Sequence, residues 1–98
     1  MEKSKQNQIQ ICDALIQFLK VVSNKTRLGI ISLLVDEEKC VGDIQDLLGA
    51  KQSYISQQLQ ILKKKGYLSS RRDGTQIYYR IKDEKILKVF KMLGEEIC

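Results

Sequence analysis

A helix-forming segment at residues 51–66, KQSYISQQLQILKKKG, carries two surfaces of different chemistry. Ile55, Leu59 and Leu62 recur at helical spacing and form a stripe suited to a protein core. The other positions carry amides and hydroxyls, where an ordinary solvated face would alternate Glu and Lys. Such groups can hydrogen-bond to the donors and acceptors at the edges of DNA bases. The candidate base-reading residues are Gln52, Ser53, Tyr54, Ser56, Gln57, Gln58 and Gln60.

The excess positive charge of the chain falls on the same part of the sequence. Of the net charge of +5, residues 51–72 contribute six basic side chains and no acidic one, whereas basic and acidic groups nearly balance elsewhere. Charge runs usually just solvate a face, and lysines at the end of a helix also suit its dipole. Solvation needs no single sign, however, whereas binding to a polyanion does. The basic residues are Lys51, Lys63, Lys64, Lys65, Arg71 and Arg72.

The neighbouring elements place this helix in a helix-turn-helix. Residues 40–50, CVGDIQDLLGA, predict a short helix that ends at Gly49, and only two residues separate that glycine from the next helix. After Gly66 the apolar period changes to about 2, and Asp73-Gly74 predicts a hairpin between YLSSRR and TQIYYRI. This hairpin would act as a wing on the DNA backbone or minor groove. Its candidate contact residues are Arg71, Arg72, Thr75 and Gln76.

The remaining segments complete a single domain over residues 1–98. Apolar residues at helical spacing predict helices at residues 8–22, 24–35 with Asn24 as N-cap, and 82–98. The expected fold is mainly α with a β-hairpin wing, in the order ααααββα. The first and last helices have more apolar surface than so small a core covers, which favours a homodimer built on both.

The composition disfavours several classes of protein. The chain has no histidine, no CxxC, no Gly-rich phosphate loop and no nucleophile beside a base, so an enzyme is the weakest hypothesis. Its longest apolar stretch is too short to span a bilayer, and the polar N-terminus lacks a signal sequence. We therefore expect a cytoplasmic protein without a membrane partner. The expected partner is double-stranded operator DNA.

Residues 24–81, and more loosely the whole chain, resemble the ArsR/SmtB family of winged-helix repressors. The matching segments include NKTRLGIISLL, CVGDIQDLLG and QSYISQQLQILKKKGYLSSRRDGTQIYYRI. The resemblance implies an obligate homodimer that represses a nearby operon and leaves DNA when an inducer binds. QSYISQQL is similar to the QSALSQHL pattern of the branch that responds to sulfur species and oxidants. Gln58 replaces a His of that pattern, and Lys51 replaces a Ser helix cap worth about 1 kcal/mol.

Three cysteines, Cys12, Cys40 and Cys98, are the candidate sensing groups. The metal-sensing motif ELCVCDL reads EKCVGDI here, and the His and Asp ligands of the last helix are missing, so a closed zinc site is not expected. A three-thiolate site for arsenite or another soft ion stays open. Of the two cysteines used by the sulfur-responsive branch, Cys98 matches one and Ser32 replaces the other. Cys40 could substitute, since thiols at helix N-termini react readily, whereas Cys12 lies on an apolar stripe and ranks last.

These features lead to one main hypothesis and one alternative. The main hypothesis is a dimeric, sequence-specific repressor whose operator binding is relieved by a thiol-directed inducer, either a persulfide or oxidant or a soft thiophile such as arsenite. The alternative is a winged-helix binding module or constitutive regulator without cysteine-based sensing. No resident cofactor is expected.

Overall fold

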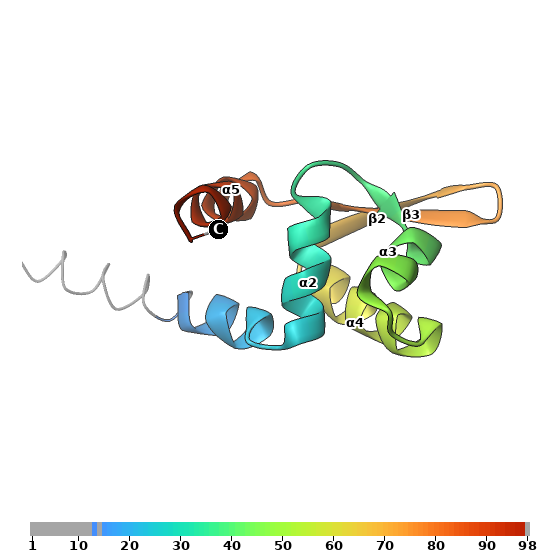
Figure 1. Ribbon diagram of the computed structural model, residues 1–98, viewed down its shortest axis with the longest axis horizontal. Helices are drawn as coiled ribbons and strands as arrows, with labels where there is room; N and C mark the ends of the chain where they lie inside the picture. Colours follow the sequence, from blue (N-terminus) through green and yellow to red (C-terminus); the bar gives the residue numbers. More distant parts are fainter. Residues whose placement is uncertain (1–12, 14, 98) are drawn as a thin grey trace, which may run out of the picture.

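Helices and strands follow the predicted order, with one short strand added between the second and third helices. The computed structural model describes residue 13 and residues 15–97 (Figure 1). Residues 15–22 form the described part of the N-terminal helix. The other elements are α2 (Lys25–Leu34), β1 (Lys39–Cys40), α3 (Val41–Leu48), α4 (Gln52–Lys64), β2 (Leu68–Asp73), β3 (Gln76–Ile81) and α5 (Glu84–Ile97).

The added strand β1 turns the predicted hairpin into a three-stranded antiparallel sheet in the order β1-β3-β2. Lys39 pairs with Tyr79, and Cys40 pairs with Tyr78. The sequence gives no sign of this strand, because two residues are too few to show an alternating pattern. Its pairing covers one edge of β3 and fixes the hairpin beside the start of α3.

Local residue chemistry sets the helix and turn boundaries. The Asn24 side chain caps α2 by accepting hydrogen bonds from the backbone N–H groups of Thr26 and Arg27 at 2.9 and 3.0 Å. Gly49 ends α3 in the left-handed conformation, with φ of 67°. The hairpin loop is Gly74-Thr75, one residue later than expected, because Asp73 still pairs with Gln76. Gly74 has a φ of 64° and Thr75 a negative φ, as in a type II′ turn.

The core lies where α2, α3 and α4 meet one face of the sheet. Ile55, Leu59 and Leu62 are buried as the α4 stripe predicts. Helical spacing predicts that Leu28 of α2 and Leu47 of α3 face the core, but both are exposed, and Ile30 is buried on α2 together with Ile31 and Leu34. The other buried apolar residues are Val21, Ile31, Leu34, Cys40, Ile44, Leu68, Tyr79 and Ile86.

The N-terminal helix and α5 lie at one end of the molecule, opposite the tip of the hairpin (Figure 1). Each helix packs part of its apolar surface on the core, and Phe18 of the first contacts Phe90 of the second edge to face at a centroid distance of 5.8 Å. Each also leaves a second apolar strip exposed, formed by Leu15, Ile16 and Leu19 on one and by Val89, Met92 and Leu93 on the other. None of the described helices has the length and apolarity needed to cross a bilayer.

Candidate nucleic-acid interface

The outward face of α4 is polar, uncharged in its first half and basic at its end. Ser53, Gln57 and Lys64 follow one another at i, i+4 and i+11, so they lie on the side opposite the buried stripe. Gln52 and Lys63 are also exposed, and Ser56 is half-buried. No acidic residue occurs anywhere on α4. This face can therefore approach a polyanion while offering hydrogen-bonding groups.

Lys51 occupies the N-cap position of α4 in an extended conformation, and its side chain caps no backbone N–H. The sequence predicted this loss of a cap. The exposed ammonium group instead adds a positive charge at the turn between α3 and α4.

Two of the candidate base-reading residues of α4 are held by the protein itself. The expectation that Gln58 lies on the exposed face is wrong, because Gln58 is only 6% exposed and its Oε1 accepts a hydrogen bond from Arg27 Nη1 at 2.9 Å. Gln60 is exposed, but its Nε2 donates to the Tyr79 hydroxyl at 3.2 Å. Burial raises the pKa of Tyr79, and this hydrogen bond opposes the shift. Residue type alone could not separate these glutamines from Gln57.

Tyr54 is exposed on the first turn of α4, and its hydroxyl interacts with the N-terminus of α2. Hydrogen bonding with the side chains of Asn24 and Thr26 lowers the pKa of Tyr54. This residue thus connects the start of α4 to the start of α2, while its exposed ring remains on the polar side of the helix.

The two wing arginines lie on opposite faces of the sheet. Arg71 pairs with Tyr78 and Arg72 pairs with Ile77 across the hairpin, and side chains alternate faces along a strand. Tyr79 shares the face of Arg72, and it is buried against the helices. Arg72 therefore projects on the α4 side of the sheet, and Arg71 projects on the other side.

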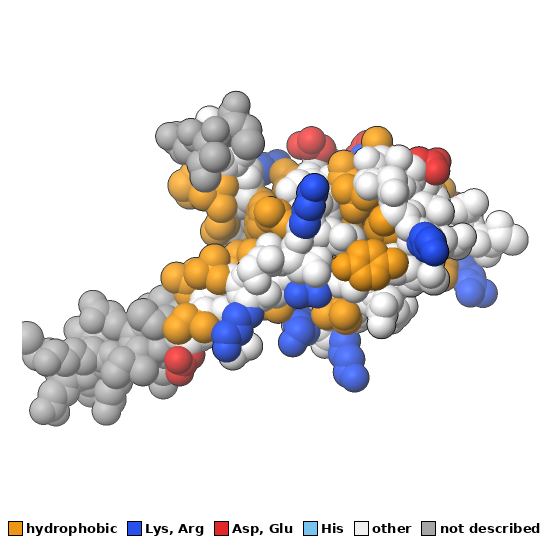
Figure 2. Space-filling model, turned by 60° about the horizontal axis from the view of Figure 1, so that its bottom comes forward, with side chains coloured by type: hydrophobic (Ala, Val, Ile, Leu, Met, Phe, Trp, Pro, Cys, Tyr) orange, Lys and Arg blue, Asp and Glu red, His pale blue; other side chains and the backbone are white. Residues whose placement is uncertain are grey.

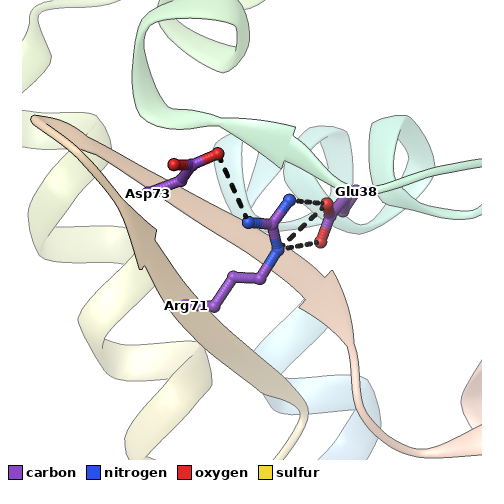
Figure 3. Close-up of polar contacts among 3 residues, drawn as sticks. All are labelled: Glu38, Arg71 and Asp73. Atoms are coloured by element: carbon purple, nitrogen blue, oxygen red, sulfur yellow. Dashed lines mark hydrogen bonds and ion pairs between the residues drawn. The ribbon is translucent and has the colours of Figure 1, made fainter.

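Arg71 is held in a cluster on that other side (Figure 3). Its Nε donates to both carboxylate oxygens of Glu38 at 3.1 Å, and its Nη2 also bonds this carboxylate. Its guanidinium lies 4.6 Å from the Tyr78 ring centroid and forms a longer ion pair with Asp73, at 3.9 Å. The hydrogen bonding of Arg71 holds the pKa of Glu38 below its ordinary value of 4.5. These contacts engage the Arg71 side chain on the face of the sheet away from α4, so we expect Arg72 rather than Arg71 to contact DNA.

Arg72 has no such partner: it forms no ion pair within residues 13 and 15–97. It is exposed, as are Thr75 and Gln76 at the hairpin tip. On the side where α4 lies, Lys and Arg side chains project along the lower edge, and acidic side chains are visible only at the upper rim and far left (Figure 2). The arrangement combines an uncharged reading surface on α4 with separate cations around it.

Comparison with known proteins assigns the family. Residues 24–70 match the family described as bacterial regulatory protein, arsR family. The biofilm growth-associated repressor of Xylella fastidiosa is 34% identical over 80 residues, which cover 82% of this chain and 70% of that protein. The chain belongs to the arsR family.

Further comparisons support the fold of this arsR-family chain. It resembles the crystal structure of the transcriptional regulator HlyU from Vibrio vulnificus, with a TM-score of 0.89 and 28% identity over 97% of this chain and 99% of that one. The predicted winged helix-turn-helix architecture is thereby confirmed. The cadmium resistance transcriptional regulatory protein CadC of Listeria innocua is 40% identical over 76 residues, or 76% of this chain. The arsR-family chain matches only 64% of the length of CadC.

Of the candidate sensing cysteines of this arsR-family chain, the structure describes Cys40. Cys40 is the N-cap residue of α3, is 9% exposed and makes no capping hydrogen bond. Ser32 on α2 donates its hydroxyl to the Leu28 carbonyl at 2.8 Å. Cys12 and Cys98 lie outside the described residues. Within the described part of the chain, no three potential metal-binding side chains come together, so that part supplies a single thiolate to any soft ion.

Proposed function

We propose that this chain is a homodimeric, sequence-specific transcriptional repressor that binds operator DNA through α4 and the β2–β3 wing. The observation that carries the proposal is the acid-free, amide-rich outward face of the second helix of the helix-turn-helix. A recognition helix in the major groove must present hydrogen-bonding groups to base edges and must avoid anionic groups beside the phosphates. The family assignment supports the same function.

Base reading and phosphate binding fall to different residues in this proposal. Ser53 and Gln57 head the outward row of α4 and face the base edges, with Gln52 and Ser56 beside them. Lys51, Lys63 and Arg72 surround that row and neutralise phosphates. Thr75 and Gln76 at the wing tip contact the adjacent backbone or minor groove. Tyr54 contributes its exposed ring at the edge of the surface.

The proposed dimer is built on the apolar strips that the N-terminal helix and α5 leave exposed. Both strips lie at the end of the molecule opposite the wing tip, and exposed hydrophobic side chains gather there (Figure 2). Two copies related by a twofold axis would bury them against each other. The two α4 helices would then read two half-sites of a palindrome about one or two helical turns apart, at about 34–36 Å per turn.

The opposite orientations of Arg71 and Arg72 provide the test of the DNA-binding proposal. Duplexes are first selected by the wild-type protein from a randomised pool, and binding of the best duplex and of a shuffled one is then measured against salt. Arg72→Ala should weaken both complexes and lower the salt slope by about one unit, the loss of one phosphate contact. Arg71→Ala is the matched control, and it should leave the slope unchanged because Glu38 already holds that guanidinium.

Two results would contradict parts of this proposal. If the wild-type protein enriches no palindromic sequence, sequence-specific binding as a dimer is wrong. If Arg71→Ala and Arg72→Ala lower the slope equally, both arginines reach the DNA and the assigned orientation of the wing is wrong.

We further propose that a thiol-directed inducer releases the repressor from its operator. With no histidine in the chain, the cysteines are its only soft, reactive side chains. The relative CadC is named for resistance to cadmium, itself a soft, thiophilic ion. Cys40 lies at the start of α3, one short helix from α4, so a group attached there would displace the reading helix. Its burial means that reaction requires local opening around β1.

The inducer proposal predicts that arsenite or inorganic polysulfide weakens operator binding, whereas zinc has little effect. A coupling free energy of about 1–3 kcal/mol corresponds to roughly a 5- to 150-fold loss of affinity. The measurement is operator affinity with and without each reagent for the wild type and for Cys12→Ser, Cys40→Ser and Cys98→Ser. If all three variants respond as the wild type does, the cysteines are not sensors. If the wild type does not respond either, a constitutive regulator becomes the better description.

A further inference from the structure

Gln58 is a polar side chain in an apolar place. It lies on the core-facing side of α4, between Ile55 and Leu62, and is the only buried polar or charged residue within the described part of the chain. Burying an amide without a hydrogen-bond partner costs free energy. Its Oε1 has a partner in Arg27 Nη1, at 2.9 Å. The glutamine is therefore not a reading residue that happens to be covered but one half of a specific contact with α2.

Arg27 joins three segments of the chain through one residue. Its Nε donates to the carbonyl of Val21 at 2.7 Å, near the end of the N-terminal helix. Its backbone N–H donates to Asn24 Oδ1 at 3.0 Å, within the cap of α2. Its Nη1 reaches Gln58, halfway along α4. The half-buried Arg27 side chain thus connects the N-terminal helix, which carries an exposed apolar strip, to α4, which carries the outward polar row.

The hydrogen bond between Arg27 and Gln58 restricts the rotation of α4, which the hydrophobic core alone restricts only weakly. Burial of Ile55, Leu59 and Leu62 holds α4 on the core, but hydrophobic burial is not directional. A hydrogen bond from a planar guanidinium restricts both distance and angle. The hydrogen bond between Arg27 and Gln58 therefore restrains the rotation of α4 relative to α2.

We propose that Arg27 and Gln58 form a positioning pair that sets the rotation of α4 relative to the N-terminal helix and thereby determines operator specificity. The proposal rests on the DNA-binding function proposed above. In a dimer built on the N-terminal helices, this pair links the dimer contact of each copy to its reading helix. Loss of the pair misaligns Ser53 and Gln57 with the base edges, whereas the surrounding cations still meet phosphates. Specific binding falls, and non-specific binding does not.

The test compares Gln58→Met with Gln58→Glu. Methionine fills a similar volume but offers Arg27 no oxygen, whereas glutamate retains the acceptor in charged form. Gln45→Met on α3 is the matched control: Gln45 is half-buried, and its side chain makes no hydrogen bond within the described residues. For each variant we would measure affinity for the duplex selected by the wild type and for a shuffled duplex of equal length, together with the melting temperature and the dimer dissociation constant.

Gln58→Met should lower the ratio of specific to shuffled affinity by about 10-fold, the equivalent of one hydrogen bond to a charged group. Its affinity for the shuffled duplex should stay within about twofold of wild type, since phosphate contacts are unchanged. Gln58→Glu should restore the ratio, and Gln45→Met should leave it unaltered.

Three outcomes would overturn the proposal. The first is an unchanged ratio of specific to shuffled affinity in Gln58→Met. The second is an equal loss of affinity for both duplexes in Gln58→Met, accompanied by a lower melting temperature. The third is a Gln58→Glu variant whose ratio of specific to shuffled affinity is as low as that of Gln58→Met. A wild-type protein that selects no duplex would instead contradict the proposed function itself.

Discussion

Replacing Leu19 with glutamate is expected to abolish the proposed dimer and, with it, tight operator binding. Leu19 is 52% exposed in the single chain, on the strip it shares with Leu15 and Ile16. In a twofold dimer the substitution occurs twice, and each copy loses buried apolar area and gains an unpaired charge at the contact. Together these effects should cost at least about 4 kcal/mol, or a thousand-fold in dimer dissociation constant. Sedimentation equilibrium and operator titration would measure the two consequences.

The matched control for this prediction is Gln17→Glu. Gln17 is exposed on the same helix, two positions from Leu19, so the substitution adds the same charge on the side away from the apolar strip. It should leave the dimer intact. A Leu19→Glu protein that remains dimeric at micromolar concentration would show that this strip is not the dimer contact.

Replacing Leu59 with alanine should destabilise the fold by about 2–5 kcal/mol, a large fraction of the total of about 5–15 kcal/mol for a domain of this size. Leu59 is fully buried at the centre of the stripe that seats α4 on the core. Removing its branched end both loses transfer free energy and leaves a cavity that the surrounding side chains fill only in part. Urea unfolding at fixed protein concentration would measure the change.

Leu47→Ala gives the same chemical change at an exposed site. Leu47 is 59% exposed on α3, so its truncation should cost much less than that of Leu59. Equal losses of stability in the two variants would indicate that Leu47 is covered in the native assembly and would redefine the surface next to α4.

Much of the fold and of the candidate interface could be predicted from local sequence. Asn24 caps α2 because its short side chain reaches the first backbone N–H groups, and Gly49 ends α3 because glycine adopts a positive φ without strain. The apolar stripe of α4 and the hairpin at Gly74 are likewise short-range patterns. Family-level motifs in the same segments correctly indicated the arsR family and the winged helix-turn-helix.

The roles of individual polar residues could not be predicted in this way. Gln57 and Gln58 are adjacent and chemically identical, but one is exposed and the other is bound to Arg27, 31 positions earlier in the chain. Arg71 and Arg72 are also adjacent, and the pleat of β2 directs one to Glu38 and leaves the other on the α4 side. In each pair, one residue is held by a contact within the protein, whereas its neighbour in the sequence remains available to DNA.

The sequence alone therefore determined the helices, the two hairpin strands, their order and the segment that carries the positive charge, because each depends on residues within one or two turns of one another. Only the tertiary structure decided which of the polar side chains in that segment are available for binding. That outcome depends on partners distant in sequence, namely Arg27 for Gln58, Tyr79 for Gln60 and Glu38 for Arg71. The buried amide of Gln58 must find a hydrogen-bonding partner, and in all three pairs the packing of α2, α4 and the sheet determines which partner lies within reach.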